Sequence, residues 1–460
     1  MKIMVYNSFP LINEWGCSSV GRVSEWHSEG RGFDSLQLHF FRSFIEVMKK
    51  NRFLFLLMLL SFLFISPLTP DNGNFKDLKK KVEVIGRVKF KKNVPVHFLG
   101  RNDMKAYIGE WFEREYPREL VEKEALFIRL MGFVAGKPTD IREQRKQVLM
   151  ENSGGIYNEK NGELLVLEDY RTTDAMNSLV IAHELRHAIQ DHHLDLKTLL
   201  SGRPPSDFDD RRLSLLAALE GDATFIMLQV GDFDSELLQS GYAGDSLLSY
   251  SPTGNYALLS SAPEIVKQQF IMPYMEGIKF IDAIFQKQKW DGISRVMREL
   301  PVSSEQILHP EKYLGKETPL AATIDYRPAG FTLYHSGVIG EFYLNILLKS
   351  DGRYVDYAEG WGGDCFEIFR HPTSGKSCLL WESLWDKEGY CNSFYQEFKR
   401  FIEKRFSCTF RQGKTGDHGF IAGNSANNYF FIHKKGNKIF YIRSDDRAQI
   451  NDFIRGGHYD

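Results

Sequence analysis

The stretch HELRHAIQDHHLDL, residues 183–196, contains the pattern H-E-x-x-H within a segment, 174–200, that has neither glycine nor proline. We expect a long helix over this segment, because glycine and proline are the residues that most disfavour a helix. On a helix, His183 and His187 lie one above the other. The opposite side carries an apolar stripe of Ile181, Leu185, Ala188 and Ile189. One face can therefore pack while the other presents two imidazoles, as two zinc ligands require.

A third ligand is needed for zinc, and two residues compete for the position. Glu220 lies at the centre of the next predicted helix, 211–230, on an apolar stripe where a carboxylate is costly unless it is paired or bound to a metal. His193 follows His183 by ten residues, which is the spacing of H-E-x-x-H-x-x-G-x-x-H, although Gln190 stands where that pattern has glycine. Glu220 is the favoured ligand, and a site of three histidines is the alternative.

On these residues the chain resembles the gluzincins, the thermolysin-like zinc peptidases. More closely, it resembles a family of uncharacterised exported bacterial zincin-like proteins. The resemblance covers roughly residues 94–370, and its motifs lie at residues 155–157, 161–164, 183–196, 218–224, 309–314, 340–342 and 361–364. It implies a zinc-dependent peptidase. Thermolysin-like enzymes have Asp four residues after the glutamate ligand, where this chain has Thr224, and Asp222 lies on another side of the helix.

The expected mechanism uses one Zn²⁺ per chain, bound by His183, His187 and Glu220. Glu184, beside the histidine pair, would act as the general base toward a water that the metal activates. Hydrogen-bond partners that orient the ligands are expected among Gln190, Asp191, Asp222 and Thr224. A further donor should stabilise the oxyanion, and the candidates are Tyr157, His309, Tyr313 and His335. The expected partner is a peptide or protein substrate.

The fold class expected is α+β, a zincin-like metallopeptidase fold that is mostly helical with a small sheet. Asn161-Gly162 lies between two β-rich runs in 154–167, which predicts a hairpin. Its edge strand, just before the H-E-x-x-H helix, could bind an extended peptide. A first strand is expected at 94–99, and further helices are expected at 103–116, 117–130, 262–288 and 338–349. A second hairpin is expected at 429–442.

The N-terminal region predicts export. An uncharged apolar run, residues 53–65, follows Lys49, Lys50 and Arg52, as in a secretory signal or a short membrane anchor. Residues 1–47 resemble the translation of a transfer-RNA gene, so Met48 is the expected start. The predicted organisation is a gene-call extension (1–47), a signal peptide or anchor (48–70), a linker (71–93), a catalytic domain (94–350) and a cysteine-containing C-terminal region (351–460). The expected location is periplasmic or extracellular, with residues 53–65 either cleaved off or anchored in the inner membrane.

The composition limits the possible partners and the possible state of the cysteines. The 460 residues include 58 Lys and Arg against 60 Asp and Glu, a balance that argues against a nucleic-acid partner. Four cysteines lie in the last hundred residues, and either two disulfides or four reduced buried thiols fit them: Cys365, Cys378, Cys391 and Cys408. Two other functions stay open, a zincin-fold binding protein without catalysis and a membrane-anchored structural protein with a fortuitous motif.

Overall fold

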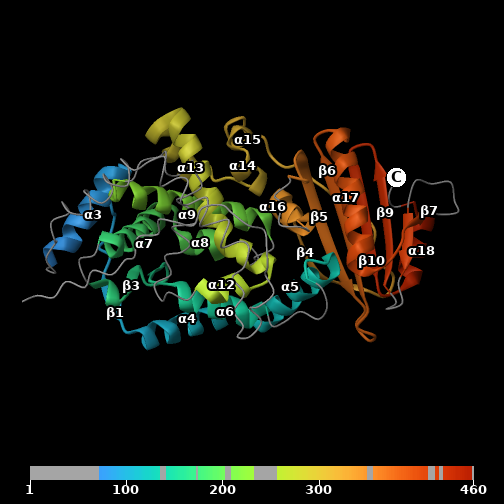
Figure 1. The fold of residues 1–460 in the computed structure, drawn as a ribbon, viewed down its shortest axis with the longest axis horizontal. Coiled ribbons are helices and arrows are strands. Elements are labelled where there is room, and N and C mark those ends of the chain that lie inside the picture. Colours follow the sequence, from blue (N-terminus) through green and yellow to red (C-terminus); the bar gives the residue numbers. More distant parts are fainter. Residues whose placement is uncertain are drawn as a thin grey trace, which may run out of the picture. The chain divides into compact units, whose positions relative to one another are not determined.

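The computed structural model describes residues 72–134, 141–171, 175–201, 209–232, 256–349, 356–412, 420–423 and 428–457, all within one unit, Leu68–Asp460. The fold is mixed α+β, as the sequence predicted, and it contains two sheets (Figure 1). The predictions for residues 1–47 and for the signal or anchor at 48–70 lie outside the described residues.

The first sheet has three strands in the order β1-β3-β2. β1 (Val96–Leu99) pairs in parallel with β3 (Glu163–Leu167), and β3 pairs antiparallel with β2 (Gly155–Asn158). The predicted hairpin is therefore confirmed, and Gly162 at its turn has φ +68°, which favours glycine. β2 is an edge strand, and it lies against the helix that carries H-E-x-x-H.

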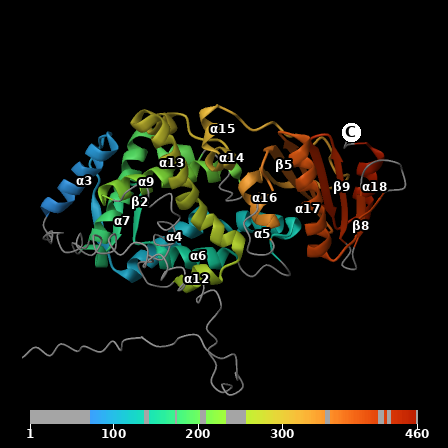
Figure 2. The same ribbon diagram turned by 45° about the horizontal axis from the view of Figure 1, so that its top comes forward.

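Most of the described residues before residue 332 are helical. Helix α9 lies between α7 and α13 and packs on both (Figure 2). It is long and apolar enough to cross a membrane, but 83% of its most apolar 18-residue stretch is buried inside the protein. The helices of this part are α3 (Asn72–Gly86), α4 (Arg101–Glu115), α5 (Arg118–Met131), α6 (Ile141–Asn152), α7 (Ala175–Leu194), α8 (Leu196–Ser201), α9 (Asp210–Val230), α12 (Tyr256–Ser261), α13 (Glu264–Arg298), α14 (Ser304–Leu308) and α15 (Pro310–Leu314). A 3₁₀ turn, η1, covers Glu168–Arg171.

The segment predicted as a linker, 71–93, instead contains helix α3. Between its many lysines, apolar residues recur at helical spacing and form one stripe, Leu78, Val82 and Ile85. Val82 is fully buried. Lys81 Nζ also donates to the Val230 carbonyl at 2.7 Å, at the end of α9. The lysine-rich composition therefore misled the prediction, because one buried face is enough to hold a helix in place.

The long helix predicted over 174–200 is divided into α7 and α8. Asp195 breaks it with φ +54°, and the backbone N–H of Leu196 donates to Asp191 Oδ1 at 3.0 Å. An aspartate that accepts from a nearby N–H competes with the helical hydrogen bonds, which explains the break.

The second sheet is larger than the small sheet that the sequence predicted. It has seven antiparallel strands in the order β4-β5-β6-β10-β9-β8-β7. The predicted domain boundary at 350/351 falls between β4 and β5, which pair with each other. The elements of this part are β4 (Thr332–Gly337), α16 (Gly340–Leu348), β5 (Trp361–Arg370), β6 (Ser377–Trp385), α17 (Glu388–Phe406), β7 (Arg411–Gln412), β8 (Phe420–Gly423), β9 (Tyr429–Lys435), β10 (Lys438–Ser444) and α18 (Arg447–Arg455).

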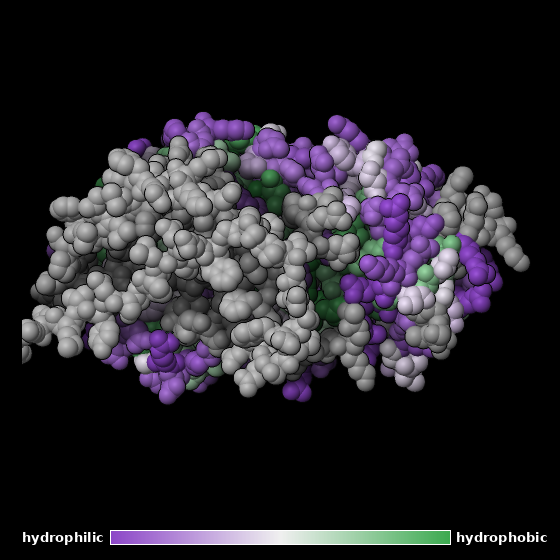
Figure 3. All heavy atoms as spheres, viewed as in Figure 1, coloured by the Kyte–Doolittle hydropathy of each residue, from purple (hydrophilic) through white to green (hydrophobic). Residues whose placement is uncertain are grey.

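Helix α17 covers this sheet through an aromatic face. Phe398 packs edge-on against Trp381 of β6, with ring centroids 5.2 Å apart, while hydrophilic residues dominate the outward side (Figure 3). The four cysteines near this core are free thiols. Burial raises the pKa of Cys378 and Cys391 to about 12, so these thiols stay protonated and unreactive at neutral pH.

The helical part and the second sheet share one hydrophobic core. Phe127 of α5 stacks on Phe366 of β5, with centroids 4.3 Å apart, and Arg443 Nη1 donates to the Leu130 carbonyl at 2.8 Å. At the start of α16, the buried Asp364 carboxylate accepts from the backbone N–H groups of Ile339 (2.7 Å) and Gly340 (3.1 Å). The sheet is therefore held to the helices by stacking and by buried hydrogen bonds.

Candidate metal centre

Helices α7 and α9 bring the H-E-x-x-H histidines and Glu220 together. Glu220 Oε2 lies 3.0 Å from His183 Nε2 and 3.3 Å from His187 Nε2, and the two Nε2 atoms are 3.0 Å apart. The three side chains are 10%, 14% and 20% exposed for His183, His187 and Glu220, so the cluster reaches solvent at one side. The structure therefore places three potential ligand atoms around one point.

The donor set fits zinc, and the three separations of 3.0, 3.0 and 3.3 Å are at or slightly below those that a bound ion imposes. Two imidazoles and a carboxylate are common zinc ligands, and a tetrahedral ion with bonds of about 2.0–2.2 Å separates its ligand atoms by about 3.3–3.6 Å. A hydrogen bond between the two Nε2 atoms requires that one of them carries no proton. Both imidazoles therefore cannot also donate to the same Glu220 oxygen. The convergence of His183, His187 and Glu220 is therefore better matched by one central cation than by hydrogen bonds alone.

Charge is strongly coupled within the cluster. Burial lowers the pKa of His187, but the Glu220 carboxylate outweighs burial and raises that pKa to about 9. Burial also opposes ionisation of Glu220, yet the charge of His187 and the hydrogen bond from His183 hold the Glu220 pKa well below its usual range. The cluster therefore keeps a carboxylate ionised, which attracts positive charge.

A buried polar chain orients His187. Its Nδ1–H donates to Gln190 Oε1 at 2.8 Å, which leaves Nε2 to face the centre of the cluster. Gln190 Nε2 in turn donates to Asp222 Oδ2 at 2.8 Å and to the Leu219 carbonyl at 2.9 Å. Asp222 also accepts from Arg186 Nε at 2.7 Å and Nη2 at 3.0 Å. Gln190 thus contacts His187 directly and Asp222 contacts Gln190, while Arg186 is a member of this chain that the sequence analysis missed.

The edge strand holds Glu184 next to the cluster. Glu184 Oε2 accepts from the backbone N–H of Tyr157 at 2.8 Å. A Cβ atom at Gly155 would lie 2.9 Å from Glu184 Cγ, so this close approach of β2 to α7 requires glycine. Tyr157 donates its hydroxyl to Asp191 Oδ2 at 2.8 Å, so that hydroxyl faces Asp191 and not the histidine pair.

Tyr274 of α13 completes the cluster and was not predicted. Its ring stacks on His183, with centroids 5.9 Å apart, and is 40% exposed. Its hydroxyl forms a hydrogen bond with Glu220, whose charge raises the Tyr274 pKa well above the usual value. Tyr274 lies 91 positions after His183 and belongs to no motif, so no signal in the sequence connects it with the site.

Three other residues that were expected at the site do not contact the histidine pair. His193 Nε2 donates to the Lys89 carbonyl at 3.0 Å, because α7 continues helically past Gln190 and turns His193 away from the pair. Asp191 contacts Tyr157 and Leu196, not the histidines. Thr224 Oγ1 is buried and has no hydrogen-bond partner among the described residues.

The remaining oxyanion candidates lie in other surroundings. Tyr313 donates its hydroxyl to the Glu299 carbonyl at 2.8 Å. His309 Nε2 donates to Glu341 Oε1 at 2.8 Å. His335 packs edge-on against Phe366 of the second sheet, with ring centroids 5.3 Å apart. The structure brings none of these three side chains into contact with His183, His187 or Glu220.

The comparison with known proteins found a match only for the part of the chain that contains the second sheet. Residues 332–453 match a family model described as a domain of unknown function, DUF8575. The match begins at the first residue of β4 and ends within α18, so it covers the seven-stranded sheet and not the H-E-x-x-H helix. No curated protein and no solved structure matches the chain.

Proposed function

We propose that this protein is a zinc-dependent peptidase with a zincin-like catalytic region. The observation that carries the proposal is the convergence of His183, His187 and Glu220, with Glu184 next to His183 in the same helix and its charge acting on His187. A structural zinc site has four protein ligands, whereas a catalytic site has three and keeps one position open. Three potential ligands are grouped here, which favours catalysis.

The residues of this chain have separable roles in the proposed reaction. Bound Zn²⁺ would supply Lewis-acid activation of water and of the substrate carbonyl. Glu184 would take a proton from the attacking water and deliver it to the leaving amine. Its Oε2 is engaged by the Tyr157 N–H, so Oε1 is the oxygen that would carry the proton. Gln190 would hold His187 in the tautomer that leaves Nε2 free to bind.

Tyr274 is the proposed oxyanion donor. It is half-exposed beside His183 and keeps its proton over the whole physiological pH range, because the Glu220 charge raises its pKa. A protonated phenol at the edge of the metal centre can donate to the negative oxygen that forms during peptide hydrolysis. It replaces the four donors expected from the sequence, which lie away from the cluster or face other groups. Its hydroxyl, which donates to Glu220 in this structure, would turn to the oxyanion when Glu220 binds the ion.

The substrate proposed is an extended peptide outside the cytoplasm. β2 is the edge strand nearest Glu184, and strand addition there would place a peptide carbonyl near the cluster. Export, by a cleaved signal or an inner-membrane anchor at residues 53–65, stays a proposal that rests on the sequence.

A cleavage screen with matched variants tests the function. Purified protein loaded with zinc is incubated with a peptide library beside Glu184→Gln, which keeps the size of the side chain and removes the base. We expect cleavage by the native protein and a loss of at least about 10²-fold in Glu184→Gln, with zinc retained. Equal product from both proteins would contradict the proposal. Zinc binding without cleavage would favour a zincin-fold binding protein.

A further inference from the structure

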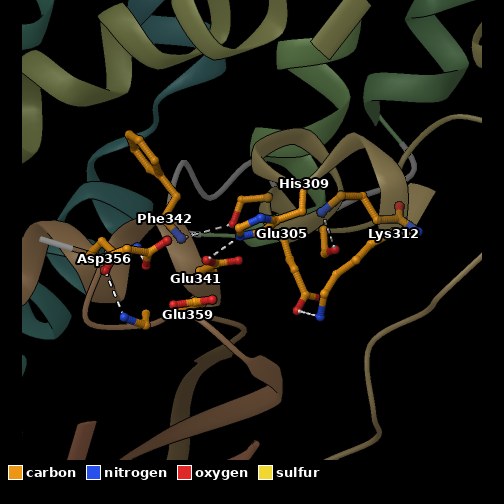
Figure 4. A network of polar contacts seen from close by, with 12 residues as sticks. Glu305, His309, Lys312, Glu341, Phe342, Asp356 and Glu359 are labelled. Carbon is orange, nitrogen blue, oxygen red and sulfur yellow. Dashed lines mark hydrogen bonds and ion pairs between the residues drawn. The ribbon is translucent and has the colours of Figure 1, made fainter. Parts of the chain in front are cut away.

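Three side chains from three separate segments meet at a second point of the fold. His309 lies between α14 and α15, Glu341 is in the first turn of α16, and Asp356 precedes β5. One potential ligand atom from each lies within 4.8 Å of the others. Figure 4 shows the three side chains gathered around one spot, with His309 and Glu341 joined by a hydrogen bond.

The Glu341 carboxylate is not satisfied by this arrangement. Its side chain is 0% exposed, and Oε1 accepts from His309 Nε2 at 2.8 Å. Its other oxygen, Oε2, is buried and has no hydrogen-bond partner among the described residues. A buried acceptor without a partner costs about 1–3 kcal/mol, and more when it is charged. A cation next to Oε2 would remove that cost.

Carboxyl groups outnumber cations in these surroundings. Lys312 Nζ is already within 2.5–2.7 Å of three carboxylates, so its charge is engaged. The imidazole of His309 then faces Glu341, Asp356 and, at 3.8 Å, Glu311. The two cations thus share six carboxylates, which are Glu305, Glu311, Glu317, Glu341, Asp356 and Asp386.

We propose that His309, Glu341 and Asp356 bind a divalent first-row transition-metal ion such as Zn²⁺ or Mn²⁺. Carboxylates suit many divalent ions, but an imidazole ligand favours a transition metal over Ca²⁺ or Mg²⁺. The neighbouring group of Glu305, Glu317 and Asp386 does not qualify, because Lys312 fills its centre. The ion would fasten the α14–α15 junction and α16 to the segment that leads into β5.

This site is separate from the α7–α9 cluster. Ser304 of α14 donates its backbone N–H to Asp210 Oδ2 at 3.0 Å, at the first residue of α9. Glu220 lies ten residues further along the same helix, about 15 Å at 1.5 Å per residue. One ion cannot serve both places, so the two sites are tested independently.

Counting bound metal in four proteins tests the proposal. The full chain is stripped with a chelator, equilibrated with Zn²⁺, passed through a desalting column and analysed by elemental mass spectrometry. We expect two Zn²⁺ per native chain, one in Glu341→Gln, one in His183→Ala and none in the double variant. Zinc should also raise the melting temperature of His183→Ala but not that of the double variant, as a clamp between segments requires.

Matched controls separate the possible failures. Glu317→Gln, in the group that Lys312 fills, should keep both ions. If Glu341→Gln does not fold, Asp356→Asn, at a partly exposed position, replaces it. Retention of the full native zinc count by both Glu341→Gln and Asp356→Asn would overturn this proposal. If instead the native chain binds one ion that Glu341→Gln loses and His183→Ala keeps, the second site stands and the proposed peptidase centre fails.

Discussion

Gly221 of α9 and Gly277 of α13 pack backbone against backbone. A Cβ atom at Gly221 would lie 2.2 Å from the Gly277 carbonyl oxygen, and one at Gly277 would lie 2.1 Å from the Ala217 carbonyl oxygen. Glu220 immediately precedes the first glycine, and Tyr274 lies one helical turn before the second. The close crossing of these helices therefore brings Tyr274 to Glu220.

Gly277→Ala should destabilise the protein by about 2–3 kcal/mol, because an added methyl group must push the two helices apart. It should also weaken zinc binding, since Glu220 moves with α9. Urea unfolding and a zinc titration measure the two effects. Gly389→Ala in α17 is the control, because a Cβ there meets nothing within 4 Å. Equal stability of the two variants would show that the crossing tolerates a side chain.

Tyr274→Phe should lower kcat by about 10²-fold with KM near the native value, because the hydroxyl that donates in the transition state is lost. Zinc affinity should change far less than in Glu220→Ala, because the hydroxyl contacts Glu220 but is not itself a proposed ligand. Steady-state kinetics on any peptide from the cleavage screen measures this. Tyr313→Phe is matched to it, because the Tyr313 hydroxyl binds the Glu299 carbonyl. A similar loss of kcat in both variants would argue that Tyr274 has no special role.

Glu220→Ala should reduce zinc affinity by more than about 100-fold, a larger loss than partners of ligands usually cause. His193→Ala should leave the affinity within about twofold, because its imidazole binds the Lys89 carbonyl. Competition with a chromogenic zinc chelator measures both. Zinc binding that depends on His193 and not on Glu220 would restore the alternative with three histidines.

Asp222→Ala should cost about 3–5 kcal/mol of unfolding free energy, because it leaves the Arg186 guanidinium buried without its carboxylate. Zinc affinity should fall as well, since Gln190 loses a partner. Chemical denaturation measured after chelation isolates the first effect. Glu397→Ala removes the carboxylate partner of the exposed Arg400 and should change stability by less than about 1 kcal/mol. The interpretation fails if both variants change stability equally.

Stability should fall on acidification in a way that depends on His335. Burial lowers the pKa of this imidazole to about 4, and the nearby Lys123 charge adds to the effect. Between pH 6.5 and pH 4 the unfolded chain therefore binds more protons, so the unfolding free energy decreases as pH falls through that window, by at most about 3 kcal/mol. Denaturation at several pH values compares the native protein with His335→Gln, which should show a shallower slope. Parallel curves would exclude this group.

Local patterns predicted several elements well. The hairpin of β2 and β3 follows from Asn161-Gly162, and the pairing of β9 with β10 follows from the turn around Gly436. Both depend on neighbours in the chain, as do helices α4, α5 and α9. The second sheet was underestimated, because β6 is buried on both faces and shows no alternation of polar and apolar residues.

The sequence by itself determined the histidine pair and its neighbour Glu184, because spacing along one helix places all three. Only the tertiary structure decided that Glu220 and not His193 meets the pair, that Arg186 and Asp222 support it, and that Tyr274 stands beside it. The physical reason is that these contacts join different helices. They depend on how closely α7, α9 and α13 approach one another. Gly221 and Gly277 set the distance between α9 and α13, and a hydrophobic pattern within one segment cannot predict this distance.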